Sequence, residues 1–259
     1  MGELTSHREL LSLDGRNAVI TGGARGIGRA IAERFCEAGA NCLLADVDAA
    51  AAAATAAALG DSYPGAEVRS VALDVTDADQ VEAAAEAAVA GLGGIDVWVN
   101  NAGIYPPESL LETAAEEYRR ILEINLLGTN LGVQSAARRM IAAGGGVIIN
   151  MASTAAHFGS GAYSASKWGV RGITSGMARE LGPHGVRVVA IGPTITETPG
   201  MAATRAEYDD AVEQLIAGIP MGRSAQPDDI ARAALFLAGD GAALISGVTL
   251  LVDGGQMSR

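Results

Sequence analysis

The stretch that decides the fold is Asn17–Gly28, NAVITGGARGIG. Its first five residues predict a buried strand, and its glycine-rich part opens a helical pattern, GRAIAERFCEAG, at 28–39. Glycines let the backbone turn tightly and approach a pyrophosphate, and a helix N-terminus attracts negative charge. A glycine loop alone also fits a mere tight turn, but its place between a strand and a helix favours phosphate binding. The candidate contacts in this loop are Gly22, Arg25, Gly26, Ile27 and Gly28.

Apolar runs recur through the chain and alternate with helical patterns. The seven runs are NAVIT (17–21), NCLLAD (41–46), VRSVALD (68–74), DVWVN (96–100), GVIINMA (146–152), VRVVAIG (186–192) and VTLLV (248–252). They lack clean polar alternation, so we expect both faces of each strand to be buried, as in a parallel sheet. The pattern predicts an α/β fold: a single-domain Rossmann-type doubly wound sheet of seven parallel strands with helices on both faces.

The chain shows no linker rich in Pro, Gly and Ser. We therefore predict an N-terminal extension, 1–12, followed by a single dinucleotide-binding and catalytic domain, 13–259. The least regular stretch is about 194–226, after the sixth predicted strand. A long excursion at the carboxyl end of a strand is typical of a substrate lid, so we expect one or two helices there.

Composition limits the partners and the compartment. Of the 259 residues, 49% are hydrophobic, which allows a large core, and the net charge of −12 argues against nucleic acid or an anionic membrane as partner. The start, MGELTSHREL, does not resemble a signal peptide, and no apolar run is long enough to span a bilayer. Cys36 and Cys42 are expected to be reduced core residues. We expect a cytoplasmic protein, and because the histidines lack ligand partners we predict no metal site.

An acidic residue, Asp46, ends the second predicted strand and is followed by Val47. It lies eighteen positions after Gly28, close to the spacing of an acid that binds the adenosine ribose hydroxyls. A carboxylate there would repel a 2′-phosphate, so the sequence predicts NAD over NADP. Asp46 could instead cap the alanine-rich helix that follows, a role that Asp48 would serve equally well. Arg25 is evidence in the other direction, because a basic loop residue could meet a 2′-phosphate.

Three motifs together resemble the short-chain dehydrogenase/reductase family. They are TGGARGIG (21–28), NNAG (100–103) and YSASK (163–167), and the resemblance runs from about residue 13 to residue 255. It includes LDV (73–75), the asparagine of EINLLGT (Asn125), MAS (151–153), the Pro193 segment and VDGG (252–255). The resemblance implies an NAD-dependent oxidoreductase that moves a hydride between the nicotinamide and a secondary alcohol or ketone, with an alcohol, sugar or steroid-like small molecule as substrate.

The resemblance also implies cofactor contacts. Asp74 and the backbone of Val75 would hold the adenine, and the residues after the fourth strand would line the cofactor channel and brace the sheet. The segment PTITET (193–198) would bind the nicotinamide carboxamide. The implied contacts beyond the glycine loop are Asp46, Val47, Asp74, Val75, Asn101, Ala102, Gly103, Met151, Tyr163, Lys167, Pro193, Thr194, Ile195, Thr196 and Thr198.

Tyr163 and Lys167 share one face if their segment is a helix, because they are four positions apart. A free tyrosine has a pKa near 10, and a nearby ammonium favours its phenolate. The resemblance implies that Tyr163 is the general base or acid, that Lys167 tunes it and binds the nicotinamide ribose, and that Ser153 holds the substrate oxygen. Asn125 would hold a water that links Lys167 to solvent. Each residue also has a purely structural alternative. Tyr163 and Lys167 alone could form an exposed pair on a helix. Ser153 could cap a strand end, and Asn125 could satisfy buried backbone groups.

Three departures from the family pattern affect the substrate side. Ser153 precedes Tyr163 by only ten positions, so the loop between them is shortened, and Thr154 is a substitute if the backbone shifts. Thr194 stands where the family often has glycine, and Thr196 where it often has Ile or Val. These changes put the substrate shape and the nicotinamide pocket in doubt more than the reaction class.

Other functions remain open on the sequence. An NADP-dependent ketoreductase of the 3-oxoacyl-reductase type would carry a basic residue after the second strand, where this chain has Asp46, Val47 and Asp48. Sugar-nucleotide epimerases share the Tyr-x-x-x-Lys pair but have a larger C-terminal region. A non-catalytic dinucleotide-binding protein would tend to have lost the tyrosine or the lysine. Family members are usually homotetramers or dimers, so the resemblance implies a homotetramer built through helices near 114–142 and 161–182 and the last strand.

Overall fold

Seven apolar segments pair into one sheet because each can bury both of its faces. The computed structural model describes residues 5–106, 111–159 and 161–258, with side chains at all of these positions but 203–209 and 211. The strands are β1 (Asn17–Thr21), β2 (Asn41–Asp46), β3 (Val68–Ala72), β4 (Val97–Asn100), β5 (Gly146–Met151), β6 (Val186–Pro193) and β7 (Thr249–Val252). They are all parallel, in the order β3-β2-β1-β4-β5-β6-β7. The predicted doubly wound sheet is confirmed, with strand ends that differ by one or two residues.

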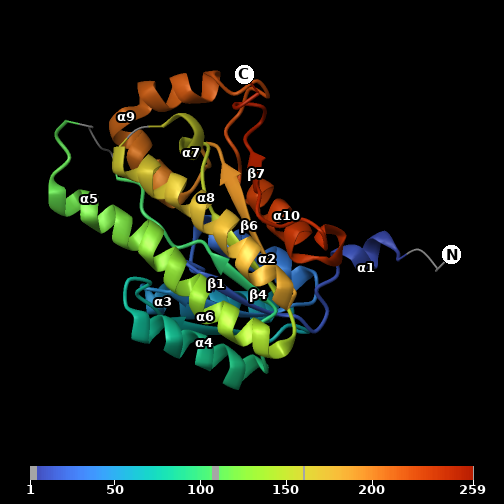
Figure 1. Ribbon diagram of the computed structural model, residues 1–259. Coiled ribbons are helices and arrows are strands. Elements are labelled where there is room, and N and C mark those ends of the chain that lie inside the picture. Colours follow the sequence, from blue (N-terminus) through green and yellow to red (C-terminus); the bar gives the residue numbers. More distant parts are fainter. Residues whose placement is uncertain (1–4, 107–110, 160, 259) are drawn as a thin grey trace.

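Helices cover the two faces of the sheet (Figure 1). One layer contains α2 (Gly26–Glu37), α3 (Ala49–Ser62) and α10 (Pro227–Ala238), and the other α4 (Ala78–Leu92), α6 (Gly128–Ala143) and α8 (Gly161–Leu181). The remaining helical segments are α1 (His7–Leu11), α5 (Ala115–Leu122), the π-helical turn η1 (Glu123–Leu127), α7 (Ala155–Phe158), the 3₁₀ turns η2 (Gly182–His184) and η3 (Asp240–Ala242), and α9 (Pro199–Ala217).

The core lies between the sheet and each helical layer. Successive strand residues point to opposite faces. Val97 and Val99 of β4 therefore pack on the layer of α2 and α10, while Trp98 between them packs on the layer of α4 and α6. Cys36 and Cys42 are buried free thiols in the first of these clusters, as expected.

A chain of buried hydrogen bonds fastens α8 to the centre of the sheet. Trp98 Nε1 donates to Asn100 Oδ1 (2.7 Å), and Asn100 Nδ2 donates to Asn150 Oδ1 (2.9 Å). Asn150 Nδ2 donates to Thr174 Oγ1 (3.0 Å), which in turn donates to the carbonyl of Val170 (2.8 Å). Because every one of these groups is buried, each bond that is lost would leave a polar atom without water. The chain thus fixes α8 against β4 and β5.

The segment after β6 forms a single long helix over the sheet edge. Thr198 caps α9 by accepting a hydrogen bond from Met201 N (3.1 Å), and Pro199 occupies the first turn, where a missing N–H is harmless. Figure 1 shows α9 at the top of the molecule, beyond the carboxyl ends of the strands and near the C-terminus. At the other end of the chain, α1 packs beside η3 and α10, while residues 1–4 of the predicted extension lie outside the described residues. Within the described ranges, no helix combines the length and the apolar character needed to cross a membrane.

We predict that Thr174→Val destabilises the protein by about 1–3 kcal/mol, because it leaves Asn150 Nδ2 buried without its acceptor at almost unchanged volume. A lower urea midpoint with an unchanged slope would measure this loss. Thr249→Val in β7 makes the same chemical change at a half-buried position outside the chain of hydrogen bonds and should alter stability by less than about 0.5 kcal/mol. Equal effects of the two substitutions would contradict the prediction.

Candidate active site

The candidate site lies at the carboxyl edge of the sheet, where β1 and β4 are neighbours although they are not consecutive in the chain. Such a switch point leaves a crevice between loops that turn in opposite directions. The glycine loop leaves β1 there with Gly22 in a left-handed conformation (φ +62°). A Cβ on Gly28 would lie 2.1 Å from the Gly22 carbonyl oxygen, so helix α2 approaches the loop closely only with glycine at that position.

The segment after β4 holds the glycine loop in place. Asn101 Nδ2 donates to the carbonyls of Thr21 (2.9 Å) and Gly22 (3.0 Å). In return, Thr21 Oγ1 accepts from the backbone N–H groups of Asn101 and Ala102, each at 3.0 Å. The predicted bracing by the asparagine-glycine segment is therefore visible as four hydrogen bonds between two strand ends.

The first turn of α2 fits an anion. Arg25 precedes the helix with an extended backbone, and its side chain makes no capping hydrogen bond. The N–H groups that begin a helix have no acceptor within it, and the helix dipole favours negative charge at this end. A pyrophosphate is thus the kind of group that Gly26, Ile27 and Gly28 could hold through their backbone.

Asp46 and Asp48 have different roles at the end of β2. Asp48 is the N-cap of α3, with its Oδ1 accepting from Ala51 N (3.0 Å). Asp46 is not the cap. Its Oδ2 accepts from Ala24 N (3.1 Å) and its Oδ1 from Asp48 N (3.0 Å), which holds the carboxylate beside the glycine loop.

The residues expected around the adenine are also near a strand end. Asp74 is exposed, and its Oδ1 accepts from the backbone N–H and the hydroxyl of Thr76 (2.9 and 2.8 Å). Val75 is buried against Gly128, whereas Val47 is 76% exposed after Asp46. A planar ring could therefore rest near Val47 and Asp74 without displacing core residues.

Lys167 is the only lysine in the chain, and α8 buries it. Its Nζ donates to the carbonyl of Met151 at the end of β5 (2.8 Å) and lies 5.7 Å from the centre of the Tyr163 ring. Burial lowers the pKa of Lys167 to about 8. In its charged form this ammonium favours the phenolate of the neighbouring tyrosine.

Tyr163 lies one helical turn before Lys167, and burial raises its pKa to about 12, although a side-chain hydrogen bond with Ser153 acts to lower it. The shortened loop therefore still brings Ser153 to the phenol. It does so through the single turn α7, in which Ser153 Oγ accepts from Ala155 N (3.1 Å). Arg171 of α8 supports that turn by donating to the carbonyl of Ala156 (2.7 Å).

Asn125 lies in the π-helical turn between α5 and α6 and is fully buried. Its side chain accepts from the N–H of Ile104 (2.8 Å) and donates to the carbonyl of the same residue (2.9 Å). It also donates to Ser166 Oγ (3.3 Å), whose hydroxyl donates to the Tyr163 carbonyl (2.6 Å). Asn125 thus satisfies backbone groups of Ile104, which is the structural role that the sequence left open beside the water-holding one. It also connects the segment after β4 to α8.

The segment after β6 closes the other side of the site. The Pro193 carbonyl accepts from Thr154 N (2.9 Å), and Thr194 Oγ1 donates to Gln256 (2.7 Å). Thr196 donates to the Thr194 carbonyl (2.8 Å), and the Ile195 carbonyl accepts from Ala225 N (2.9 Å). The two threonines that depart from the family pattern therefore make local hydrogen bonds that shape this turn.

The start of the lid and the glycine loop also meet. A Cβ built on Gly26 would be 3.4 Å from Cγ2 of Thr198, the residue that caps α9. The glycine loop therefore lies against Thr198, the last residue of the 193–198 segment.

Tyr105 is a site residue that the sequence analysis did not select. Its ring packs edge-on against Tyr163, with 4.6 Å between ring centres and 73° between planes, and it is 49% exposed. The signal was its position two residues after Gly103, in the segment that Asn125 fixes through Ile104. A half-exposed aromatic ring there can form one wall for a substrate beside the Tyr163 hydroxyl.

Comparisons with known proteins identify the family. A family model described as enoyl-(acyl carrier protein) reductase matches residues 22–257. The D-threitol dehydrogenase of Mycolicibacterium smegmatis is 46% identical over 247 residues, which cover 94% of this chain and 93% of that protein. The sorbitol dehydrogenase of Cereibacter sphaeroides is 39% identical over 258 residues, covering 95% and 99%.

Among solved structures, one described as an NAD(P)-dependent gluconate 5-dehydrogenase from Beutenbergia cavernae, with bound NADP at low occupancy, matches with a TM-score of 0.90. It is 36% identical and covers 96% of this chain and 100% of that chain. This likeness over nearly the whole length, together with the two dehydrogenases, settles the family. The chain belongs to the short-chain dehydrogenases/reductases, and it is an oxidoreductase that uses a nicotinamide cofactor to interconvert an alcohol and a carbonyl group.

Proposed function

We propose that the protein is an NAD-dependent dehydrogenase of secondary alcohols, with sugar alcohols as the first class to test. The observation that carries the proposal is the joint placement of Ser153, Tyr163 and Lys167 beside the end of β5. The relatives named for D-threitol and sorbitol support a polyol substrate. We further expect the reaction to take place in the cytoplasm.

In the proposed mechanism, Tyr163 Oη takes the hydroxyl proton of the alcohol as the C–H bond breaks. The nicotinamide, when bound, supplies the acceptor for the hydride, and its positive charge adds to that of Lys167 in favouring the phenolate. Ser153 Oγ holds the substrate oxygen within reach of the phenol. In the opposite direction Tyr163 returns the proton to the carbonyl oxygen. Asn125 keeps Ile104 and α8 in register and so preserves the position of both side chains.

The proposed preference for NAD rests on Asp46. Its carboxylate is held at the glycine loop by two backbone N–H groups and can accept from ribose hydroxyls, whereas a 2′-phosphate would meet a negative charge. The NADP seen in the Beutenbergia relative is the observation that favours the second candidate, an NADP-dependent ketoreductase. We favour NAD because the one cation of the glycine loop, Arg25, is paired with Asp48.

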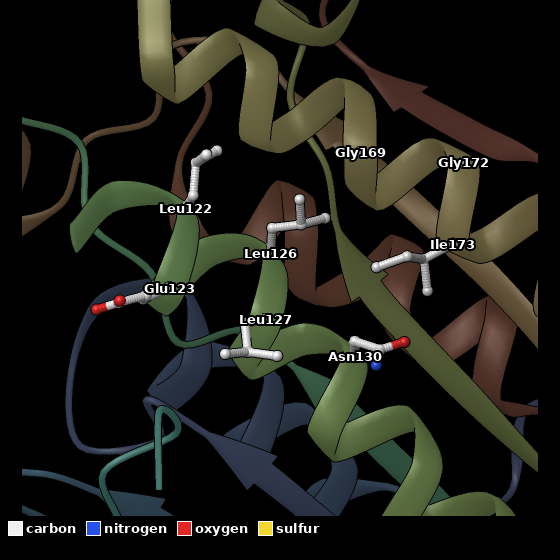
Figure 2. Close-up of a pocket in the computed structure, with 8 residues that line it drawn as sticks. All are labelled: Leu122, Glu123, Leu126, Leu127, Asn130, Gly169, Gly172 and Ile173. Carbon is white, nitrogen blue, oxygen red and sulfur yellow. The ribbon is translucent and has the colours of Figure 1, made fainter. Parts of the chain in front are cut away.

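We also propose that the enzyme is a homotetramer or a homodimer. An apolar hollow of about 490 Å³ lies between the π-helical turn and α8, lined mainly by Leu122, Leu126, Leu127, Gly169, Gly172 and Ile173. Figure 2 shows Leu126 and Ile173 pointing toward one another across it. An exposed apolar surface of this kind is typical of a subunit contact. The helices that line it are those for which the family resemblance implies an interface.

We expect Tyr163→Phe to lower kcat/KM by about 10²–10⁴-fold, because it removes the proton-transfer group and leaves the ring in place. NADH formation should be followed over D-threitol, sorbitol, other secondary alcohols and hydroxysteroids. Tyr118→Phe in α5 is the matched control, since it removes the phenol of a 40% exposed ring that is not among the site residues, and it should retain activity to within about twofold. Full activity in the Tyr163 variant would remove this residue from the mechanism.

The buried ammonium predicts a pH dependence of stability. The pKa of Lys167 is lowered from 10.5 to about 8 on folding, so between these values the unfolded chain binds more protons and stability rises with pH. Lys167→Met removes this effect. Between pH 7 and pH 9.5 the free energy of unfolding of the wild type should therefore increase, relative to the variant, by about 2 kcal/mol.

Urea unfolding at the two pH values measures this difference, and a constant difference would contradict it. Because the chain has a single lysine, carbon-13 labelling of lysine gives one side-chain resonance that reports its titration directly. Its midpoint should lie near pH 8 in the folded protein.

For the oligomer, we expect Gly172→Glu to sediment at micromolar concentration as a smaller assembly than the wild type, that is, as dimers if the wild type is a tetramer and as monomers if it is a dimer. A Cβ at Gly172 meets nothing within 4 Å in its own subunit, so the substitution leaves the fold intact and places a charge on the apolar hollow. Gly60→Glu in α3 has equally open surroundings and is the matched control. A wild type that sediments as a monomer would refute the proposed assembly.

A further inference from the structure

Arg25 and Asp48 form an ion pair beside the carboxylate of Asp46. Arg25 belongs to the glycine loop and Asp48 to the turn after β2, and their side chains are 64% and 41% exposed. Both groups are therefore at the surface where the ribose of the cofactor is expected.

Asp48 makes three contacts that join the elements around the end of β2. One carboxylate oxygen caps α3 through Ala51 N (3.0 Å), while the other pairs with Arg25. Its backbone N–H donates to Asp46 Oδ1 (3.0 Å). The position of the Asp48 carboxylate is thus fixed by the helix that it caps, and Arg25 is the longer and more exposed partner.

The charges of the three side chains decide what this surface attracts. A free guanidinium in the glycine loop would suit a phosphate, because its fork of N–H donors matches phosphate oxygens. With Arg25 held by Asp48, the three groups carry one positive and two negative charges. If Arg25 paired with a 2′-phosphate, Asp48 would lose its partner and its carboxylate would lie unpaired beside the doubly negative phosphate.

We propose that Asp48 is a second determinant of cofactor preference, which holds Arg25 away from a 2′-phosphate and so makes Asp46 effective. The inference rests on the proposed preference for NAD. It adds a specificity-determining residue to the carboxylate that would bind the ribose. An exposed ion pair is weak by itself, so we expect Asp48 to change the preference by roughly tenfold rather than to set it alone.

The test is the binding of NADH and NADPH by fluorescence titration, which needs no substrate and no turnover. Its readout is the ratio of the two dissociation constants. Asp48→Asn removes the charge but keeps a side chain that caps a helix well. We expect this variant to bind NADPH roughly tenfold better relative to NADH than the wild type does. Arg25→Ala alone should not improve the binding of NADPH relative to NADH, because it removes the cation and leaves two carboxylates beside the 2′-phosphate.

The double variant Arg25→Ala/Asp48→Asn identifies the cause. If Asp48 acts by holding Arg25, the double variant loses most of the gain of Asp48→Asn. If it keeps the whole gain, Asp48 acts only as a repulsive charge and the inference is wrong. An unchanged ratio in Asp48→Asn, with a normal melting curve, also overturns it. A wild type that binds NADPH as tightly as NADH would instead refute the proposed preference for NAD, from which the inference starts.

Discussion

The burial of a single ammonium group is the constraint on which the candidate site depends. A buried charge needs hydrogen-bond partners, and Lys167 finds one in the carbonyl of the last residue of β5, Met151. This contact fixes both the position of α8 along its axis and its rotation about that axis, relative to the end of β5. The hydrogen-bond chain from Trp98 to Thr174 supplies that restraint two helical turns further on. Tyr163 is then placed by the helix itself, one turn before the lysine.

Two further connections make the site a single unit. Asn101 ties the glycine loop to the end of β4, and Asn125 ties the segment after β4 to α8. Asn101 donates through its amide nitrogen to two carbonyls, and Asn125 uses both the oxygen and the nitrogen of its amide. An apolar residue at either position would leave these backbone groups unpaired. These contacts hold the glycine loop and the helix that contains Tyr163 in one fixed geometry.

Local patterns were sufficient to predict the strands, the glycine loop and the helical pair Tyr163 and Lys167. Those features depend on the spacing of apolar side chains and on the residues that form turns, and both can be recognised in short stretches of sequence. The resemblance to a family added Asn125 and Ser153. What could not be predicted depends on contacts between distant segments. The edge-on packing of Tyr105, the π-helical turn and the pairing of Arg25 with Asp48 are of this kind, because no local rule says which residues the fold brings together.

The contact between Gly22 and Gly28 has a consequence for how proteins built this way can diverge. A side chain on Gly28 would need the space of the Gly22 carbonyl and would displace α2 from the loop, and a side chain on Gly22 would collide with Asn101 and Ala102. Neutral drift is thereby directed to the outward-facing neighbours, among them Arg25, Asp46 and Asp48, which contact solvent and each other. The backbone that we propose receives the cofactor is closed to variation, while the side chains that we propose distinguish NAD from NADP can be exchanged in single steps.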